Sequence, residues 1–394
     1  MLSIKVSHDA EKLLLALNGR IDSDTCEEFI GKIRDVRDMH PKADIIFDCS
    51  ELKYISGGGI HVLIALSHEL KIKLISVLPE VKIILEGAGV LDMFEVTDYI
   101  REIQVQHESL LEDCGNYEIY SVNKNTVLKL FTSDISFDAV KREHANSHIA
   151  LKSGIPSIIV YDIVRFEDRY GFLTERTDYK PVNAIIKTSP LLISRCAANM
   201  GKILSFMHSI EKIPDELPDT ATHLRVLAGQ MTKYLHEREI KFLINMIDAV
   251  PHFERFVHGN FTARNVFVTN DSALISDFGK MTSGNPIFDL GFLYMVNVLC
   301  ADFLSNKLNG ITPAQSRQLW QLFVQSYMGA KAKTRTAQMV IYITGLLMMT
   351  LYPATHDVDI DTAEKMIALA RRDLFPAGEK LIDVIASADL KVFL

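Results

Sequence analysis

The stretch FVHGNFTARNVFVTNDSALISDFGK, Phe256 to Lys280, decides how this sequence is interpreted. Its second part, NVFVTNDSALISDFG, predicts a β-hairpin that turns at Asn270–Ser272. Such a hairpin brings Asn265, at the start of the first strand, beside Asp277, at the end of the second. An amide oxygen and a carboxylate are hard oxygen ligands, so the pair predicts a Mg²⁺ site.

A lysine inside another predicted strand supplies a further part of the same site. Lys129 lies among apolar residues in TVLKLF, and a buried lysine without a charged partner is costly. Glu143, in KREHANSH on the predicted helix that follows, is the best candidate for the carboxylate that meets it. Phosphoryl transfer needs such a cation against the phosphates, a metal site and an oriented acceptor. The alternative is that Lys129 and Asp277 belong to ordinary buried ion pairs.

The strand lysine, the helix glutamate, the spacing HGNxxxxN and the Asp-Phe-Gly triplet follow one another in the order of protein kinases. Over roughly residues 110–300 the sequence resembles the aminoglycoside phosphotransferase branch of the protein-kinase-like fold. The resemblance implies two lobes with ATP between them. It also implies that Lys129, held by Glu143, contacts the α- and β-phosphates, and that Asn265 and Asp277 hold Mg²⁺.

The same resemblance assigns further positions. The hinge that holds adenine through backbone groups falls in LTERTD, at Glu175, Arg176 and Thr177. Gly115 is the one glycine that remains of the family's loose glycine loop. Contacts between backbone amides of this loop and the phosphates are therefore the least secure part of the resemblance. Asp289, in GNPIFDLG, corresponds to an aspartate that braces the catalytic loop. Two cations flank the site, Arg264 and Lys280, and solvated surface charge is the expected role of each.

Asn260 stands where the family carries an aspartate that accepts the proton of the attacking hydroxyl group. An amide keeps the shape of that side chain but removes its charge, and it cannot act as a base at neutral pH. Positioning, Lys129 and Mg²⁺ survive the change, and a loose transition state demands little of a base. Nucleotide binding should therefore persist while catalysis is weak, unless another carboxylate replaces the missing one. The alternative is that Asn260 only satisfies hydrogen bonds in a loop kept for binding.

Residues 1–100 follow a different pattern, in which short strands such as DIIFDCS alternate with helices such as GGGIHVLIALSHEL. This alternation implies an α/β layer with partly parallel strand pairing. The series LNGRID, DCSELKYISGGGIHVLI and VKIILEGAGVLDMFEV, in this order, resembles the STAS domain of anti-sigma factor antagonists. The resemblance implies a surface that selects a protein partner.

The STAS resemblance also locates a switch that this sequence lacks. In that family a serine before the second helix is phosphorylated, and the matching position here is Gly58, with Ser56 at the place of the preceding acidic residue. Glycine has no hydroxyl group, so the usual switch cannot operate at Gly58. Ser56 could still be modified, but its simpler role is to cap the helix that follows.

Composition limits the partners and the location. The net charge of −8 and the pI near 5.9 argue against a nucleic-acid partner, because phosphate backbones are bound by concentrated basic surfaces. The five cysteines are widely spaced without a CxxC pair, and the start MLSIKVSHDAEK lacks a signal peptide's apolar core, which together favours the cytoplasm. The run Thr336–His356 is long enough to span a membrane, but its Thr, Gln, Gly and Pro residues favour a buried core helix and no membrane contact.

The sequence therefore predicts a STAS-type α/β domain over residues 1–105 and a two-lobed, α+β kinase-like domain over residues 110–394. The smaller lobe is expected at about 110–177 and the larger at about 178–394. The favoured function is a regulatory protein that uses ATP and Mg²⁺ to phosphorylate an unknown small molecule or protein. The alternatives are a catalytically silent nucleotide sensor and an interaction protein without a nucleotide site.

Overall fold

The structure is a computed structural model that describes the chain except for residues 1, 10–11, 41–43, 69–71, 270–271, 356–357 and 394. The chain divides into two compact units, Met1–Ile103 and Gln104–Leu394. The predicted turn at Asn270–Ser272 lies, for its first two residues, outside the described part, as does the last residue of the run Thr336–His356.

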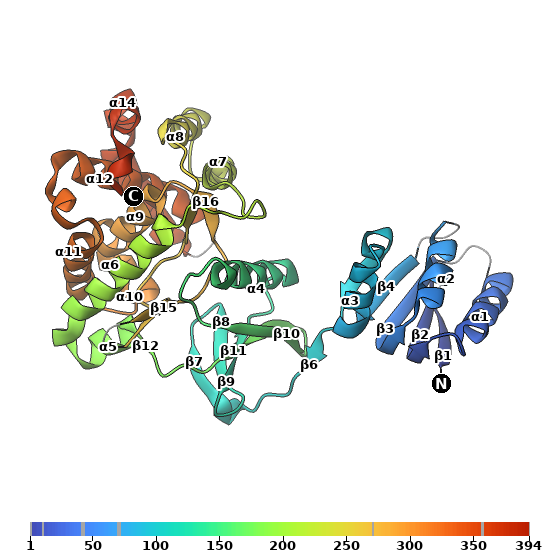
Figure 1. Ribbon diagram of the computed structural model, residues 1–394. Helices are drawn as coiled ribbons and strands as arrows, with labels where there is room; N and C mark the ends of the chain where they lie inside the picture. Colours follow the sequence, from blue (N-terminus) through green and yellow to red (C-terminus); the bar gives the residue numbers. More distant parts are fainter. Residues whose placement is uncertain are drawn as a thin grey trace. The chain divides into compact units, whose positions relative to one another are not determined.

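The first unit is built on a five-stranded sheet with the order β1-β2-β3-β4-β5 (Figure 1). β1 and β2 are antiparallel, whereas β2 to β5 pair in parallel, so the predicted α/β layer is confirmed. The strands are β1 (Ser3–Asp9), β2 (Lys12–Ile21), β3 (Asp44–Ile55), β4 (Ile72–Val77) and β5 (Glu95–Asp98), and a short strand β6 (Arg101–Glu102) follows. The helices are α1 (Cys26–Met39), α2 (Gly57–Ser67) and α3 (Pro79–Gly87).

The glycine-rich start of α2 lies close to the sheet. Ser56 caps the helix, because its Oγ accepts a hydrogen bond from the N–H of Gly59 at 3.3 Å. A Cβ at Gly59 would lie 2.5 Å from the side chain of Ile21, so this position has no room for a side chain. Gly58 has room, since the nearest atoms to its Cβ would be Cys26 Sγ and Ser56 Oγ, each at 3.7 Å. The helix start therefore requires glycine at 59 but not at 58.

The second unit begins with a small antiparallel sheet in which five strands follow the order β10-β11-β9-β8-β7. Helix α4 contacts β10 and β11 and carries a serine cap at its start, where Ser136 Oγ accepts from the N–H of Ala139 (Figure 1). These elements are β7 (Leu110–Asp113), β8 (Tyr117–Ser121), β9 (Thr126–Phe131), α4 (Phe137–Lys152), β10 (Val160–Phe166) and β11 (Arg169–Glu175).

Gly171 allows β11 to approach the strand that carries Lys129. A Cβ at Gly171 would lie 2.2 Å from the main-chain oxygen of Lys129. Gly171→Ala is therefore expected to lower the free energy of unfolding by about 1–3 kcal/mol, the usual cost of overpacking. Gly229→Ala in an exposed helix position is the control: nothing lies within 4 Å of the added Cβ, so stability should stay equal or rise. Urea denaturation measures both, and equal effects of the two changes would contradict the expectation.

The rest of the second unit is mainly helical, with two small sheets beside the smaller lobe. One sheet contains β12 (Lys180–Pro181), β14 (Val266–Val268) and β15 (Ala273–Ile275), and the other contains β13 (Arg255–Val257) and β16 (Thr282–Gly284). The helices are α5 (Val182–Thr188), α6 (Ile193–Ser209), α7 (Thr220–Gln230), α8 (Glu237–Ala249), α9 (Ile287–Tyr294), α10 (Ala301–Leu308), α11 (Pro313–Met328), α12 (Arg335–Leu351), α13 (Ile360–Asp373) and α14 (Glu379–Ser387).

The apolar helix α12 forms part of the core of this lobe. The segment Arg335–Thr355 is long and apolar enough to cross a membrane, and 78% of its apolar window is buried inside the protein. It packs closely on α9, because a Cβ at Gly291 would lie 2.7 Å from the side chain of Thr344. The burial supports the interpretation of this run as a core helix.

Candidate functional site

The predicted ion pair between Lys129 and Glu143 is confirmed. β9 carries Lys129 and α4 carries Glu143, and the Lys129 Nζ lies 2.6 Å from Glu143 Oε1. Both side chains are buried, and the ammonium group also lies 4.0 Å from the centre of the Tyr117 ring. The pair anchors the helix to the sheet and fixes the position of the cation.

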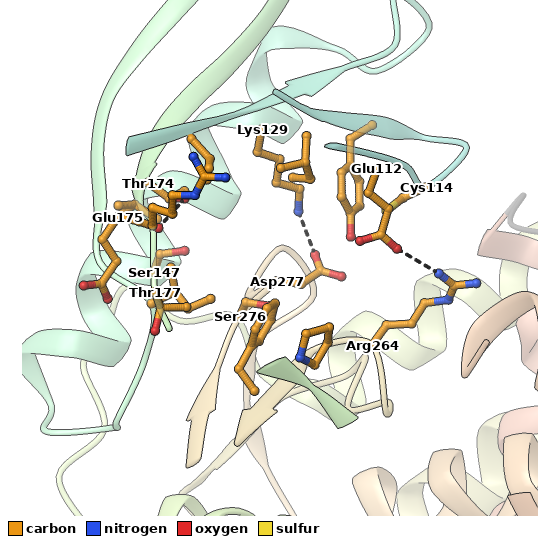
Figure 2. A pocket seen from close by; sticks show the side chains of 18 of the residues that line it. Glu112, Cys114, Lys129, Ser147, Thr174, Glu175, Thr177, Arg264, Ser276 and Asp277 are labelled. Carbon is orange, nitrogen blue, oxygen red and sulfur yellow. Dashed lines mark hydrogen bonds and ion pairs between the residues drawn. The ribbon is translucent and has the colours of Figure 1, made fainter. Parts of the chain in front are cut away.

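The hairpin β14–β15 brings Asn265 and Asp277 together, as its two strands require. Val266 pairs with Ile275, and the N–H of Ser276 donates to the main-chain oxygen of Asn265 at 2.9 Å. Asp277 follows directly, and Asn265 Nδ2 donates to its Oδ2 at 3.0 Å. Asp277 has a φ of +68°, which is unusual for a residue other than glycine. Its other oxygen, Oδ1, lies 3.5 Å from Lys129 Nζ (Figure 2). Residues far apart in the sequence thus meet around one carboxylate.

The side chain of Asn260 faces the same carboxylate. Asn260 Nδ2 donates to Asp277 Oδ2 at 2.7 Å, and the main-chain oxygen of Asn260 accepts from Asn265 Nδ2 at 2.8 Å. The backbone N–H of Asn260 donates to His258 Nδ1 at 3.1 Å. His258 Nε2 therefore carries the proton, which it donates to the main-chain oxygen of Ser276 at 3.1 Å. The loop conformation thus aims the amide of Asn260 into the site.

Asp289, on α9, holds the backbone of this loop. Its carboxylate accepts from the N–H of His258 at 2.7 Å and from the N–H of Gly259 at 2.8 Å. His208 Nε2 donates to the same carboxylate at 3.0 Å. Burial raises the pKa of Asp289, but the hydrogen bond and charge of His208, together with His258, outweigh burial, so the pKa lies below its ordinary value. The contacts are those of a brace that acts on the main chain.

Asp289→Asn is expected to lower the free energy of unfolding by about 2 kcal/mol at pH 7, because hydrogen bonds to charged groups contribute about 1.5–3 kcal/mol. The folded-state pKa lies below the ordinary 3.8. Asp289 therefore stabilises the fold fully above the ordinary pKa and loses this contribution as the pH falls through the folded-state pKa. Urea denaturation between pH 7 and pH 3 should show a shallower acid loss in the variant.

The control is Asp248→Asn. Asp248 pairs with Arg225 at 2.7 Å, but both side chains are more than two-fifths exposed, at 47% and 43%. Exposed pairs contribute about 0–1 kcal/mol. Equal losses of stability and equal pH profiles in the two variants would contradict the role assigned to Asp289.

Around Lys129 the site has more negatively charged groups than positively charged ones. Burial lowers the pKa of Lys129, but Asp277 and Glu143 outweigh it and raise the pKa, so the lysine is charged. Burial raises the pKa of Asp277, yet Lys129, followed by His258 and Lys280, brings it below the ordinary value. Burial raises the pKa of Glu143 against the attraction of Lys129. Two carboxylates around one ammonium group favour the arrival of a further cation.

Magnesium fits the residues present. The described residues include no group of three or more His, Cys, Asp or Glu side chains placed to hold a metal ion. Mg²⁺, however, is commonly held by one or two protein oxygens together with substrate phosphates and water. Asp277 offers carboxylate oxygens, and Asn265 offers an amide oxygen from a side chain in contact with that carboxylate. The donor set is that of a metal site completed by a phosphorylated ligand.

A cavity of about 260 Å³ opens beside Lys129 and Asp277 (Figure 2). Its walls are apolar, and the residues predicted as a hinge line its far end. The apolar residues include Ile119, Val127, Phe172 and Phe267, and the hinge residues are Glu175, Arg176 and Thr177. A flat aromatic ligand suits such a slot, since ligand sites combine apolar walls with a few polar groups.

The hinge backbone is partly occupied by internal hydrogen bonds. The N–H of Glu175 donates to the main-chain oxygen of Ile159, and the N–H of Arg176 donates to that of Asn125 at 2.8 Å. The guanidinium of Arg176 donates to Ser121 Oγ at 2.9 Å. The N–H of Thr177 makes no hydrogen bond within the described part of the chain. Thr177 is therefore the hinge residue best able to donate to a ligand.

Gly115 and Arg264 lie differently from the sequence-based expectations. Gly115 forms the β7–β8 turn with a φ of +87°, but its neighbour Cys114, rather than Gly115, lines the cavity. Arg264 lines the cavity instead of lying on an open surface, and its Nη1 is 3.6 Å from Glu112 Oε1 on the opposite lobe (Figure 2). Lys280 is also half-buried and lines a neighbouring cavity. Both cations therefore belong to the cleft.

Asn309 is a site residue that the sequence analysis missed. Its Oδ1 accepts from the N–H of Ala263 at 3.0 Å, and its Nδ2 donates to Asn297 Oδ1 at 2.8 Å and to Ser316 Oγ at 3.0 Å. The three polar side chains are buried, and they hold the end of the loop that begins at His258. The sequence signal, an asparagine before a glycine after a helix, is that of an ordinary turn.

The fold and this cleft are those of the kinase-like phosphotransferases. Residues 111–321 match the phosphotransferase enzyme family, and residues 2–103 match the STAS domain. The chain therefore belongs to the phosphotransferase enzyme family and carries an additional STAS domain. A comparison with curated proteins gives no significant match.

Solved structures show the same likeness at low identity. A choline/ethanolamine kinase family protein from Mesorhizobium loti is 15% identical, with a TM-score of 0.48 over 71% of this chain and 92% of its own. A thermostable mutant of the aminoglycoside phosphotransferase APH(4)-Ia is 12% identical, with a TM-score of 0.47 over 78% and 99%. A streptomycin–ATP–APH(2")-IIa complex is 14% identical, with a TM-score of 0.44 over 79% and 98%. Function is therefore inferred from the site itself.

Proposed function

We propose that the second unit binds MgATP in the cleft between its lobes and transfers the γ-phosphoryl group slowly to an acceptor. The observation that supports this most directly is the meeting of Lys129, Glu143 and Asp277 within 2.6 and 3.5 Å beside an apolar cavity. In this proposal Lys129 contacts the α- and β-phosphates, and the N–H of Thr177 donates a hydrogen bond to adenine. We propose that the first unit selects the protein partner with which this activity is associated.

The proposed step is an in-line displacement. The acceptor's hydroxyl oxygen forms a bond to the γ-phosphorus while the bond from that phosphorus to the β,γ-bridging oxygen breaks, which releases ADP. The acceptor's proton passes to water, because the amide of Asn260 cannot take it. Bound at Asn265 and Asp277, Mg²⁺ would neutralise charge on the β- and γ-phosphates. Lys129 and the loop fixed by Asp289 position the reacting groups.

A nucleotide sensor without catalysis is the second candidate. The observation that favours it is the hydrogen bond from Asn260 Nδ2 to Asp277 Oδ2 at 2.7 Å. The bond directs the amide toward the metal ligand, where it stabilises the site before any nucleotide arrives. In this case occupancy by ATP, rather than transfer, would alter what the protein binds. The five unpaired cysteines support a reducing compartment such as the cytoplasm for either candidate.

The test of the proposal is binding of MgATP followed by turnover. MgATP at about 100 times its Kd should stabilise the full chain by about 2.7 kcal/mol, seen as a rise in Tm of a few degrees. Excess EDTA should abolish most of the rise, because Asn265 and Asp277 then hold no metal. Release of ADP over hours distinguishes slow transfer from sensing. Absence of any Tm shift with MgATP would refute both candidates.

A further inference from the structure

A second cavity, of about 560 Å³, adjoins the first on the side away from the hinge. The two cavities share Lys129 and Asp277, but Asn260 lines only the second, and Thr177 lines only the first. With adenine at Thr177 and the phosphates at Lys129, the second cavity lies where an acceptor would approach the γ-phosphate. The residues that line this cavity therefore indicate the chemical class of the acceptor.

Besides Lys129, four cationic side chains line this cavity: Arg264, which faces Glu112, and three others from separate elements. Arg142 comes from α4, Lys280 from the segment after Asp277, and Lys307 from the end of α10. Arg142 Nε donates to the main-chain oxygen of Gly279 at 3.4 Å, which keeps the arginine beside the segment that carries Lys280. These cations are additional to Lys129, which lies between two carboxylates.

The carboxylates around the same cavity are engaged elsewhere. Among the described lining residues they are Glu143, Asp277 and Asp359. Glu143 and Asp277 surround Lys129. Asp359 caps α13, where its Oδ1 accepts from the N–H of Thr362 at 2.8 Å and its Oδ2 from Thr362 Oγ1 at 3.0 Å. Asp359 also interacts electrostatically with Lys307, so each carboxylate in the described part of the lining has a helix start or a cation as its partner.

The pKa of a neighbouring histidine, His223, is lowered by two of the same cations. His223 lines a small side cavity of about 50 Å³ that shares Lys280 with the acceptor cavity. Burial lowers the pKa of His223, and Lys280 and Arg142 lower it further. The field of the cations therefore extends beyond their own surface into the adjoining space.

We propose that the acceptor is a small, hydroxyl-bearing anion, a hydroxy acid or a phosphorylated alcohol, whose negative group is held by Arg142, Lys280 and Lys307. This assignment rests on the proposed function. A small molecule suits this site better than a polypeptide, because only a short segment separates Asp277 from the start of α9 at Ile287. Such a segment leaves no room for the long activation segment that positions peptide substrates in protein kinases.

The binding test uses the full chain saturated with MgADP, which fills the nucleotide site, and four probes. Glycerol 3-phosphate and glycerate are the anions, glycerol is the neutral probe and choline is the cation. Titration calorimetry should detect both anions, more weakly as salt rises, and should detect neither glycerol nor choline. The proposal would be overturned if glycerol or choline bound as tightly as the anions or more tightly. It would also be overturned if neither anion bound more tightly than these two probes.

Variants locate the binding group. Lys307→Gln should raise the Kd of glycerol 3-phosphate about tenfold, the effect of losing one charge-assisted hydrogen bond, and Lys280→Gln should act similarly. The affinity for MgADP should change less than twofold for Lys307→Gln. Lys241→Gln, an exposed lysine of α8 outside both cavities, is the matched control and should change neither value. If Lys307→Gln and Lys280→Gln both behave like Lys241→Gln, the assignment is wrong.

The experiment separates this inference from the proposed function. If MgADP binds but the anions do not, the acceptor assignment fails and the nucleotide site stands. If MgADP does not bind, the proposed function fails, and glycerol 3-phosphate titrated into the nucleotide-free chain still tests the cation cluster. Phosphate incorporation into an acidic peptide in preference to the small anions would also overturn the assignment, since it would identify a protein acceptor.

Discussion

Asn260→Asp is expected to increase the rate of phosphoryl transfer from MgATP by about 10²–10⁴-fold, the usual contribution of a positioned general base. The backbone of the loop should not change, because Asp289 holds it through the N–H groups of His258 and Gly259. The new carboxylate would occupy the position of the present amide and accept the acceptor's proton. Steady-state release of ADP in the presence of acceptor measures the effect.

The same change should cost stability when no metal is bound. The amide now donates to Asp277 Oδ2 at 2.7 Å, and a carboxylate in its place would repel that oxygen. In EDTA the variant is expected to lose about 1–3 kcal/mol of its free energy of unfolding, because repulsion between two carboxylates replaces a hydrogen bond to a charged oxygen. MgATP should restore most of the loss.

Asn123→Asp is the matched control for this variant. Asn123 is exposed, and its Oδ1 accepts from the N–H of Asn125 at 2.8 Å, a bond that an aspartate keeps. The control should alter neither the rate nor the stability in EDTA. If the natural sequence already turns over MgATP as fast as Asn260→Asp, another group acts as the base. That result would contradict the interpretation that Asn260 weakens catalysis.

The second large effect is expected for Lys129→Met. Removing the ammonium group leaves the buried Glu143 and the half-buried Asp277 together without a cation, a change that costs about 3–5 kcal/mol in other buried ion pairs. The variant should also lose the Tm shift with MgATP, since the cation that contacts the phosphates is gone. Urea denaturation and titration calorimetry measure the two consequences separately.

Two comparisons make this prediction specific. Lys141→Met removes an exposed lysine of α4 that pairs with Asp138 at 2.8 Å, and such pairs contribute about 0–1 kcal/mol. Adding Glu143→Gln to Lys129→Met should return part of the lost stability, because one unpaired carboxylate is neutralised, but it should not return MgATP binding. A recovery of MgATP binding would show that Lys129 has no contact with the phosphates.

The part of the site that depends on local geometry could be predicted from the sequence. A hairpin brings Asn265 and Asp277, which flank its two strands, close together, and the cost of an unpaired buried lysine calls for a carboxylate, which the next helix supplies as Glu143. Both expectations agree with the observed contacts. The α/β layer of the first unit was predictable for the same reason, because alternation of short strands and helices admits few arrangements.

The remainder depends on packing between distant elements. Asn309 reaches Ala263 only because α10 ends beside the loop, and a turn asparagine carries no mark of such a partner. Arg142 and Lys307 are ordinary surface cations in the sequence, and their shared cavity exists only once α4 and α10 are placed. The contact between Arg264 and Glu112 likewise requires two lobes in position. Charge in the sequence identifies these residues as polar but not as neighbours.

The brace formed by Asp289 has an evolutionary consequence. Since Asp289 accepts hydrogen bonds from main-chain N–H groups, the side chain at position 260 can change without a change in the surrounding backbone. Asparagine and aspartate codons differ in their first base alone, so a lineage could lose or regain the proton acceptor through a single point mutation. Silent and active descendants of this chain would then be separated by a reversible genetic step.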